Sequence, residues 1–233
     1  MRIALLGYGK MGKAIEKIAV KRGHEIVLKV DNNTSSYDIL TTDIAIDFST
    51  PTSAYKNINN CINNNIPVIS GTTGWLDKYD DIVALCKEKD GAFISATNFS
   101  LGVNIFFELN EKLAEMMASL KEYNISIEEI HHTEKLDAPS GTAITLAEGI
   151  LKNTDKKDWQ LNVTNSEDSL PIVSKRISEV SGTHAITYTS SVDTLEIKHT
   201  AHNREGFALG AVVAAEWLLD KKGVYTMKDV LGI

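Results

Sequence analysis

Short apolar runs alternate with longer amphipathic stretches along the first hundred residues of the chain. The runs are short enough to be strands, and their unbroken apolar character is typical of strands buried in a parallel sheet. Most of the stretches between them repeat apolar residues at helical spacing, as Met11, Ile15 and Ile18 do. This alternation predicts an N-terminal Rossmann-type domain, a parallel sheet with covering helices. The predicted strands lie at residues 2–6, 26–30, 44–48, 67–70 and 92–95.

The pattern changes near residue 100, where small and polar residues interrupt it and we place a domain junction. Later apolar runs are separated by turns rather than helices, which predicts a C-terminal α+β domain with an open mixed sheet. The charged and polar residues 152–168 are expected to form a surface excursion. Strands are predicted at 125–130, 172–177, 184–190 and 195–201, and helices at 103–120, from Ser140 to 151, and at 209–220, before a short tail.

A glycine-rich turn, Gly7-Tyr8-Gly9-Lys10-Met11-Gly12, joins the first predicted strand to the first helix. Gly7 permits a tight turn, Gly9 lets a pyrophosphate approach the backbone, and Gly12 lets the helix pack against the strand. Asp31 follows the second strand, about twenty positions after the last glycine, where an acid can accept hydrogen bonds from a ribose 2′-hydroxyl. The arrangement predicts a dinucleotide site. The alternative is a glycine turn that serves packing alone.

The residues after Asp31 bear on the choice of cofactor. Asn32 and Asn33 follow it, so a 2′-phosphate would meet an acid and no nearby cation. This favours NADH slightly over NADPH, although loops from elsewhere could supply the charge. Residues 32–42 are too few and too polar for a full crossover helix, so this half of the sheet is expected to be abbreviated.

Two further loops follow predicted strand ends, where ligands bind in open parallel sheets. We predict that both contact the cofactor and that Asn98 reaches the nicotinamide or a ribose, although plain turns would have the same composition. The predicted contacts are Gly71, Thr72 and Thr73 after the fourth strand, and Ala96, Thr97, Asn98 and Phe99 after the fifth.

The helix predicted to begin at Ser49-Thr50-Pro51 is rich in asparagine. A hydroxyl residue followed by proline in the first turn is a helix start signal. Ala54, Ile58, Cys61 and Ile62 form its apolar stripe. The asparagines at positions 57, 59, 60 and 63–65 are interpreted as its solvated face and its end, with no function assigned.

Residues 128–143 hold the densest chemistry in the chain. The run starts as a strand, places His131 beside His132, and adds Lys135 before a turn at Asp137-Ala138-Pro139. Ser140-Gly141-Thr142 then opens a helix, whose free backbone N–H groups and hydroxyls can hold a carboxylate or a phosphate. Proton donors therefore precede an anion site by a few residues.

Neighbouring residues on a strand point to opposite faces, so His131 and His132 cannot both serve one ligand from a regular strand. Either the strand ends between them or only one acts directly. A metal site with Glu128, Glu129 or Asp137 is an alternative, but the pattern lacks a further His or Cys at ligand spacing, and no metal is expected. The lysine of this run is either a solvated loop charge or a residue of the site.

Composition narrows the classes of function. An apolar content of 43% supports a packed core, and a formal net charge of -7 argues against a general nucleic-acid binder. A local basic pocket for an acidic metabolite remains compatible with that charge. Cys61 and Cys86 lack metal-ligand spacing, as expected for reduced thiols in a cytoplasmic protein. We expect neither a signal peptide nor a membrane span.

The run from His131 through the Asp-Ala-Pro-Ser-Gly-Thr-Ala sequence resembles the signature of the 4-hydroxy-tetrahydrodipicolinate reductase (dihydrodipicolinate reductase) family. Sixteen residues, 128–143, carry this specific resemblance. Weaker parts of the family pattern occur in order along most of the chain, at 7–12, 71–74, 98–102, 199–204 with His199, Ala201 and Arg204, 207–211 and 227–232.

The resemblance implies a reductase of lysine and diaminopimelate synthesis that reduces a cyclic dicarboxylate with NADH or NADPH. His131 would be its acid/base residue and Lys135 its proton donor. It further implies a homotetramer of two-domain subunits. Residues 1–100 with 205–233 would bind the dinucleotide, and 101–204 would bind substrate and form the oligomer. The implied substrate contacts are His132, Lys135, Ser140, Gly141 and Thr142.

The chain departs from the family pattern in two places. The glycine turn has one residue fewer between its first two glycines than in many relatives, and the segment after Asp31 is short, which leaves the cofactor preference open. Two other functions would share the nucleotide-binding domain. A related amino- or imino-acid dehydrogenase, such as one acting on aspartate, would not need the His-His-x-x-Lys and Ser-Gly-Thr motifs. A nucleotide-sensing regulator would be expected to carry a basic nucleic-acid-binding segment.

Overall fold

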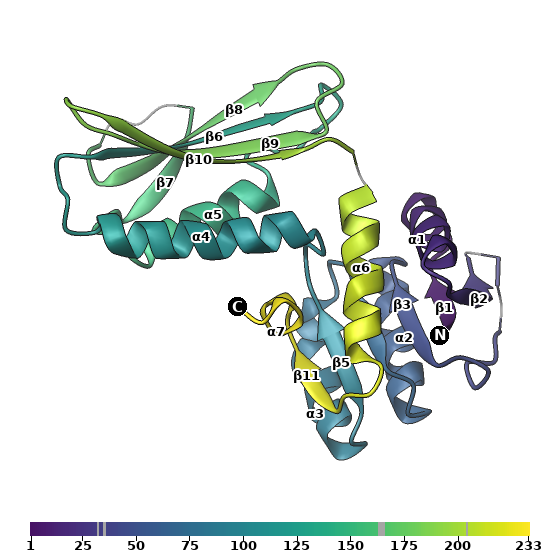
Figure 1. Ribbon diagram of the computed structural model, residues 1–233. Coiled ribbons are helices and arrows are strands. Elements are labelled where there is room, and N and C mark those ends of the chain that lie inside the picture. The colour runs from purple at the N-terminus through teal and green to yellow at the C-terminus, as the bar shows by residue number, and fades with distance from the viewer. Residues whose placement is uncertain (32, 35, 163–165, 204) are drawn as a thin grey trace. The chain divides into compact units, whose positions relative to one another are not determined.

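The chain forms two compact units in a computed structural model (Figure 1). The first consists of Met1–Leu101 with Glu205–Ile233, and the second of Gly102–Arg204. The structure describes residues 1–31, 33–34, 36–162, 166–203 and 205–233. Each unit has its own sheet and its own apolar core.

A six-stranded parallel sheet forms the centre of the first unit. Its strands are β1 (Arg2–Leu6), β2 (Glu25–Val30), β3 (Ile44–Asp47), β4 (Val68–Ser70), β5 (Ala92–Ser95) and β11 (Gly223–Tyr225), in the order β11-β5-β4-β3-β1-β2. Ile3 and Leu5 face one core while Ala4 and Leu6 face another, because successive strand residues point to opposite faces. The apolar runs of the sequence are thus explained by burial on both faces.

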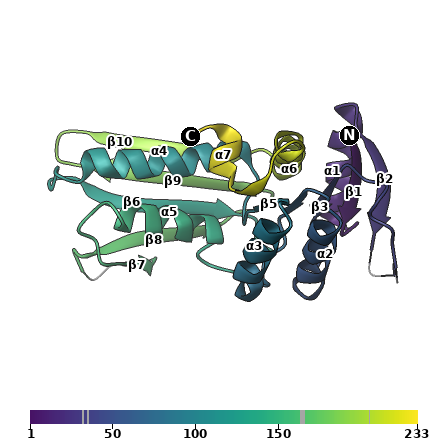
Figure 2. The ribbon, with the colours of Figure 1, turned by 90° about the horizontal axis from the view of Figure 1, so that it is seen from below.

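Helices cover both faces of this sheet (Figure 2). They are α1 (Lys10–Lys21), α2 (Pro51–Asn63), α3 (Tyr79–Glu88), α6 (Glu205–Leu218) and α7 (Met227–Leu231), with a 3₁₀ turn, η1 (Leu76–Lys78), before α3. Residues of α1 and α6 pack on one side of the sheet, and residues of α2 and α3 pack on the other. The described residues between β2 and β3 contain no helix, so this crossover is abbreviated as predicted.

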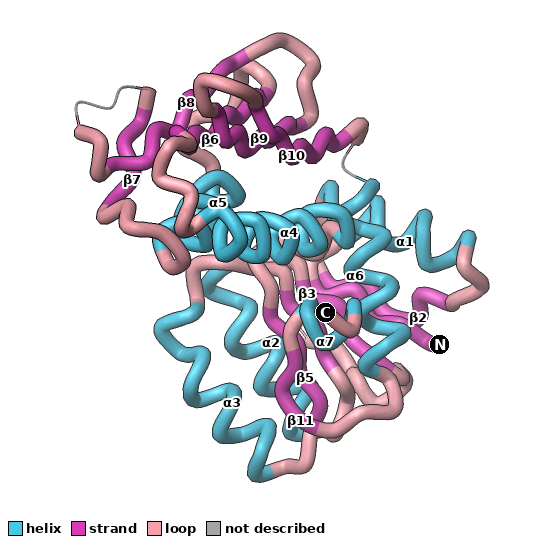
Figure 3. Tube along the Cα trace, turned by 60° about the vertical axis from the view of Figure 1, so that its left-hand side comes forward, coloured by secondary structure: helices cyan, strands magenta, loops and turns pink. Residues whose placement is uncertain are grey.

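The second unit contains a five-stranded mixed sheet. Its strands are β6 (Asn124–His131), β7 (Asp158–Leu161), β8 (Ser169–Arg176), β9 (Gly182–Thr189) and β10 (Thr194–Ala201), in the order β10-β9-β6-β8-β7. The helices α4 (Leu101–Met117) and α5 (Gly141–Leu151) cover one face (Figures 1 and 3). Asn110 Nδ2 donates a hydrogen bond to the Leu146 carbonyl, 2.9 Å away, and joins the two helices. The predicted fold class is therefore confirmed.

Two short strands were not predicted from the sequence. β7 lies inside the segment that was expected to be a surface excursion, and β11 lies in the tail. β7 has four residues and β11 has three, too few for an alternation of apolar and polar residues to be recognised in the sequence. Each is defined instead by its pairing, β7 with β8 and β11 with β5. The helix predicted from 209 begins at Glu205. Over the described residues, no helix combines the length and apolar character needed to cross a membrane.

Candidate active site

The glycine turn between β1 and α1 packs too closely for side chains at two of its glycines. Gly7 has a φ of 103°, and a Cβ there would lie 2.1 Å from the carbonyl oxygen of Phe48. A Cβ at Gly12 would lie 2.4 Å from the carbonyl oxygen of Gly7. By contrast, no described atom lies within 4 Å of the Cβ position of Gly9, the N-cap of α1. The turn therefore leaves open backbone at the position predicted for a pyrophosphate.

A pocket of about 1190 Å³ lies beside this turn, within the first unit. Four of the predicted cofactor residues line it: Gly7, Tyr8, Gly9 and Asp31. Its other walls come from the loops after β2 and β3 and from α2. The remaining predicted cofactor residues do not line this pocket: Lys10, Met11, Gly12, Gly71, Thr72, Thr73, Ala96, Thr97, Asn98 and Phe99.

Asp31 is oriented by the turn that follows it. Its Oδ1 accepts hydrogen bonds from the Asn33 amide, at 2.9 Å, and from the Thr34 hydroxyl, at 3.0 Å. The side chain is exposed at the pocket wall, and none of the residues that the structure describes forms an ion pair with it. Asn32 lies outside the described residues. An exposed acid without a cation beside it suits a ribose hydroxyl better than a phosphate.

The two other predicted cofactor loops pack around one aromatic side chain, Phe48. A Cβ at Gly71 would lie 2.2 Å from the Phe48 ring, so a side chain at this position would displace the ring. The Phe48 ring also contacts that of Phe99, with centroids 5.8 Å apart. Asn98 Oδ1 accepts a hydrogen bond from the Ser100 amide at 2.8 Å. Packing therefore shapes both loops, and their contacts with a cofactor stay predictions.

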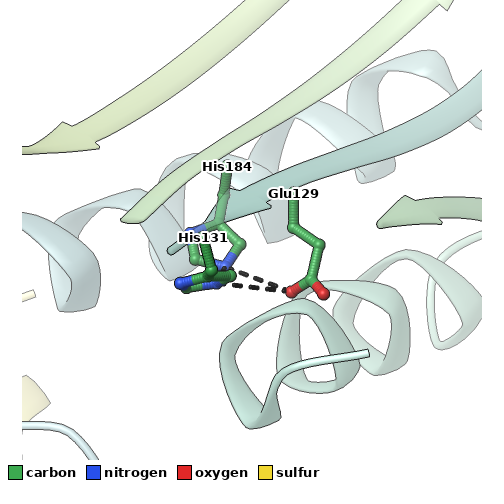
Figure 4. A group of neighbouring side chains, drawn as sticks. All are labelled: Glu129, His131 and His184. Atoms are coloured by element: carbon green, nitrogen blue, oxygen red, sulfur yellow. Dashed lines mark hydrogen bonds and ion pairs between the residues drawn. The ribbon is translucent and has the colours of Figure 1, made fainter. Parts of the chain in front are cut away.

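Three ionisable side chains meet in the second unit: Glu129, His131 and His184 (Figure 4). Glu129 and His131 lie two residues apart on β6 and so share one face. In the antiparallel register of β6 and β9, Glu129 is paired directly with His184. The Nε2 atoms of His131 and His184 lie 3.5 and 3.7 Å from Glu129 Oε2, and 3.4 Å from each other.

Glu129 is fully buried, and donors surround its carboxylate. Besides the two imidazoles, it accepts hydrogen bonds from the Ser140 amide at 3.0 Å and the Ser174 hydroxyl at 2.6 Å, and Arg176 Nη1 lies 3.5 Å away. Burial alone would raise the pKa of Glu129, but hydrogen bonds from the histidines and serines lower this pKa far below its usual range. The group is therefore ionised throughout the physiological range.

His184 differs from an ordinary surface histidine. Burial lowers its pKa, although Glu129 opposes that effect. Its Nε2 lies 3.1 Å from the hydroxyl of Ser140, in addition to its contacts with Glu129 and His131. Because three polar groups converge on one ring nitrogen, a change of proton at that nitrogen alters all three contacts.

The two adjacent histidines lie on either side of the end of β6, which stops at His131. His131 is 9% exposed and turns toward the buried carboxylate. His132 follows the strand, and its Nδ1 is buried without a hydrogen-bond partner among the described residues. The condition under which both could serve one site, an interruption of the strand between them, is met. Their separate roles stay predictions.

Lys135 is held by the acid two residues after it. Its Nζ lies 2.7 and 2.6 Å from the carboxylate oxygens of Asp137, and this ammonium holds the pKa of Asp137 below its usual range. Arg176 donates hydrogen bonds to the carbonyl oxygens of Lys135 and Asp137, at 3.3 and 2.6 Å. Because the same guanidinium lies near Glu129, Arg176 links the lysine loop to the buried carboxylate.

Some of the backbone N–H groups at the start of α5 are hydrogen-bonded and others are free. Ser140 is 3% exposed, and as the N-cap its hydroxyl accepts a hydrogen bond from the Ala143 amide at 3.2 Å. The amides of Gly141 and Thr142 have no hydrogen-bond partner among the described residues, and the Cβ position of Gly141 faces open space. Free N–H groups at the positive end of a helix can receive an anion.

The buried histidines and Glu129 could in principle also hold a cation, since their ligand atoms lie within 4.8 Å of one another. The same carboxylate already accepts the Ser140 amide and lies near the Arg176 guanidinium, which would repel a metal ion. We therefore interpret the cluster as a hydrogen-bonded network.

Two models of protein families together match nearly the whole chain. The first, described as dihydrodipicolinate reductase, N-terminus, matches residues 1–99, and the second, described as its C-terminus, matches 102–231. The chain belongs to the dihydrodipicolinate reductase family. The predicted family is thus confirmed, and this reductase is an NAD(P)H-dependent oxidoreductase. The two alternative functions are disfavoured accordingly.

Individual relatives agree with the family. The reductase is 58% identical over 234 residues to the 4-hydroxy-tetrahydrodipicolinate reductase of Christiangramia forsetii, covering 99% of this chain and 98% of that protein. It is 36% identical to the enzyme of the same name from Archaeoglobus fulgidus, covering 99% and 100%. Its fold matches that of dipicolinate-bound dihydrodipicolinate reductase from Paenisporosarcina sp. TG-14, with a TM-score of 0.78 at 24% identity over 97% of each chain.

The sequence alone did not reveal three residues around the predicted site of the reductase. The sequence indicates Glu129 only as an alternative metal ligand, although its place two residues before His131 puts both side chains on one face of a strand. His184 carried no local signal, because the β6–β9 register brings it close across 53 residues of chain. Arg176 likewise arrives from a neighbouring strand, β8. Arg204, part of the family pattern, lies outside the described residues.

Proposed function

We propose that this reductase converts 4-hydroxy-tetrahydrodipicolinate into tetrahydrodipicolinate in the synthesis of diaminopimelate and lysine. The reaction takes up one hydride and one proton and releases water. The observation that carries the proposal is the constellation in the second unit. There, an ionised Glu129 holds His131, a lysine lies on the adjoining loop, and the open start of α5 follows. A ring with two carboxylates requires such cationic and N–H partners.

The cofactor site is proposed in the first unit. Gly9 offers open backbone at the start of α1 for the pyrophosphate, and Asp31 offers a carboxylate for a ribose hydroxyl. A bound nicotinamide supplies the hydride, which no side chain can provide. The absence of a described cation paired with Asp31 supports a preference for NADH over NADPH.

The substrate carboxylates are proposed to bind at the start of α5. Gly141 and Thr142 would donate their free amides, and His132 and Lys135 would add their side chains. Lys135 can exchange its present partner, Asp137, for a carboxylate of the substrate, because an ammonium donates hydrogen bonds to either carboxylate. Ser140 is proposed to shape this site rather than bind substrate strongly, since its amide and hydroxyl already serve Glu129 and His184.

Proton transfer is assigned to His131 and Lys135. A lysine ammonium can donate a proton to the ring as hydride arrives, and a histidine can exchange protons near neutral pH. Glu129 supports the second role, because its buried carboxylate lies 3.5 Å from His131 Nε2 and can hold the ring in place.

The division of labour between the units is also a proposal. The first would bind the dinucleotide, and the second would bind substrate and form a homotetramer. In the second unit Ile127 and Ile186 pack in the core, so their strand neighbours Ser126 and Thr187, which are paired with each other, point to the other face of the sheet. No described helix of that unit covers this second face (Figure 1). A sedimentation measurement tests the tetramer.

The free thiols of Cys61 and Cys86 suit the proposed cytoplasmic location.

A coupled assay tests the function directly. The purified synthase that makes the hydroxylated ring is supplied with its substrates, and loss of nicotinamide absorbance at 340 nm is followed after the reductase is added. We expect turnover with at least one of NADH and NADPH. Absence of turnover with both would refute the proposal, and oxidation of aspartate instead would favour the dehydrogenase alternative.

A further inference from the structure

A second buried carboxylate, Asp47, lies at the end of β3 in the first unit and is 0% exposed. Its Oδ1 accepts hydrogen bonds from the Ser49 hydroxyl at 2.7 Å and the Asn57 amide at 2.9 Å. Its Oδ2 accepts from the hydroxyls of Ser70, at 2.9 Å, and Thr72, at 2.7 Å. All four donors are neutral. A carboxylate buried this deeply is costly unless its oxygens are fully hydrogen-bonded, as they are here.

These hydrogen bonds connect separate parts of the first unit. Ser49 belongs to the loop after β3, Asn57 to α2, and Thr72 to the loop after β4. The Ser49 amide also donates to the Thr72 hydroxyl at 2.8 Å, which joins the two loops directly. Tyr37 extends the network by donating to Asn57 Oδ1 at 3.0 Å. Asp47 is therefore the common acceptor for two loops and a helix.

The network lies directly against the large pocket. Ser49, Asn57 and Tyr37 all line it, together with the glycine turn. The interpretation of the α2 asparagines as a solvated face was wrong for Asn57, which is 7% exposed. It lies three residues after Ala54 and four before Cys61, so the apolar stripe of α2 turns it inward.

Phe48, the residue after Asp47, packs against both the turn at Gly7 and the loop at Gly71. Its carbonyl oxygen would meet a Cβ at Gly7, and its ring would meet a Cβ at Gly71. Its amide is fixed to the Leu6 carbonyl at 2.8 Å. A shift of residue 48 therefore moves both turns that the proposed function assigns to the cofactor.

We propose that Asp47 is a positioning residue for cofactor binding. Its carboxylate holds the loops after β3 and β4 around Phe48, so that the pocket is formed before the dinucleotide enters. Such preorganisation strengthens binding by removing the ordering that would otherwise accompany it. The inference rests on the proposed function, because it takes this pocket as the nicotinamide cofactor site.

Asp47→Asn is the direct test, because it keeps the shape and replaces one acceptor by a donor. Thr72 already accepts the Ser49 amide, so a side-chain NH₂ group facing it leaves the Thr72 hydroxyl without its acceptor. The opposite orientation brings that NH₂ group against the NH₂ group of Asn57. We expect the dissociation constant for NADH, measured by calorimetry, to rise about tenfold or more. The KM for the dicarboxylate substrate should stay within about twofold.

Exchanging the two side chains provides the rescue. In Asp47→Asn/Asn57→Asp the carboxylate moves to the other end of the same hydrogen bond, where it can accept from residue 47 and from Tyr37. This variant should recover part of the lost NADH affinity. Asp43→Asn is the matched control. It removes a carboxylate of the same unit that pairs with Arg2 at the surface and does not line the pocket, so NADH binding should be unchanged.

The outcomes separate the two proposals. If the unmodified protein binds neither NADH nor NADPH, the proposed function fails. If it binds and Asp47→Asn binds equally well, the positioning role is refuted. Equal loss of NADH affinity and substrate affinity, with no recovery in the exchanged variant, would also refute it and show a general contribution to folding. Should Asp47→Asn not fold, Thr72→Val removes one donor at similar volume, and NADH affinity unchanged in that variant would overturn the inference.

Discussion

Replacing Glu129 by glutamine should destabilise the protein far more than the same change at Glu128, its neighbour on β6. Glu129 belongs to a buried network, whereas Glu128 pairs with Lys175 at the surface. The substitution keeps the length and shape of the side chain and removes its charge. The Ser140 amide and the Ser174 hydroxyl now bond to the carboxylate, and the imidazoles of His131 and His184 lie within ion-pair range of it. A glutamine amide nitrogen must face one of these donors, whichever way it turns.

The expected loss of stability comes from the partners of Glu129, which stay buried after its charge is removed. Removing one partner of a fully buried pair costs about 3–5 kcal/mol, because the other charge stays buried. Here the main cationic partner, Arg176, has a side chain that is 22% exposed and can be partly solvated. We therefore expect a decrease of about 2–4 kcal/mol in the free energy of unfolding. If Glu129 positions the His131 ring for proton transfer, kcat should fall by about 10²–10⁴-fold as well.

Urea denaturation of the unmodified protein, Glu129→Gln and Glu128→Gln measures the difference. Glu128 is the neighbouring residue on β6, points to the opposite face and pairs with Lys175 at the surface, so its loss should cost at most about 1 kcal/mol. The folded protein lowers the pKa of Glu129 from an ordinary value of 4.5, so its stabilisation is complete above that pH and is lost as the pH falls below it. The advantage over Glu129→Gln should therefore shrink in acid. Equal stability of the two variants at pH 7 would refute this reasoning.

Three further substitutions test the proposed site. Lys135→Ala should lower kcat by about 10²–10⁴-fold while NADH affinity, measured by calorimetry, is unchanged, and a matched loss of affinity would place the lysine in the wrong site. Asp31→Ala should weaken NADH more than NADPH, and equal effects would mean that Asp31 does not contact the ribose. Gly182→Ala would bring a Cβ within 3.2 Å of His131 Cε1, so the ring must shift and kcat should fall by roughly twofold to tenfold; an unchanged kcat would show that the ring position is not critical.

Local signals in the sequence were sufficient for the glycine turn and for the start of α5. Gly12 is required by a contact within one strand-turn-helix unit, Gly7 has a φ of 103° in the turn itself, and Ser140 caps the helix that it opens. Each of these features is decided by residues that are close together in the chain. They could be predicted because steric fit and capping act over a few residues.

The two carboxylate networks could not be predicted in the same way. Glu129 meets His184 through the register of β6 and β9, and Asp47 meets Thr72 through the parallel pairing of β3 and β4. Register depends on the packing of the whole sheet, and a shift of one residue would turn each side chain to the other face. The burial of Asn57 was accessible in principle, from its spacing to the apolar stripe of α2. Asparagine is usually exposed, so its polar side chain favoured the solvated face instead.

Asp47 and Glu129 are both fully buried carboxylates near strand ends, but their hydrogen-bond and ion-pair partners differ, and so do the roles that we propose for them. Only neutral groups donate to Asp47, and burial raises its pKa. Histidines and an arginine surround Glu129, and its pKa is lowered. A carboxylate among neutral hydroxyls can fix the geometry of loops, whereas one among imidazoles also determines where a proton resides. Loss of the first should therefore appear in the binding of the cofactor, and loss of the second in kcat and its dependence on pH.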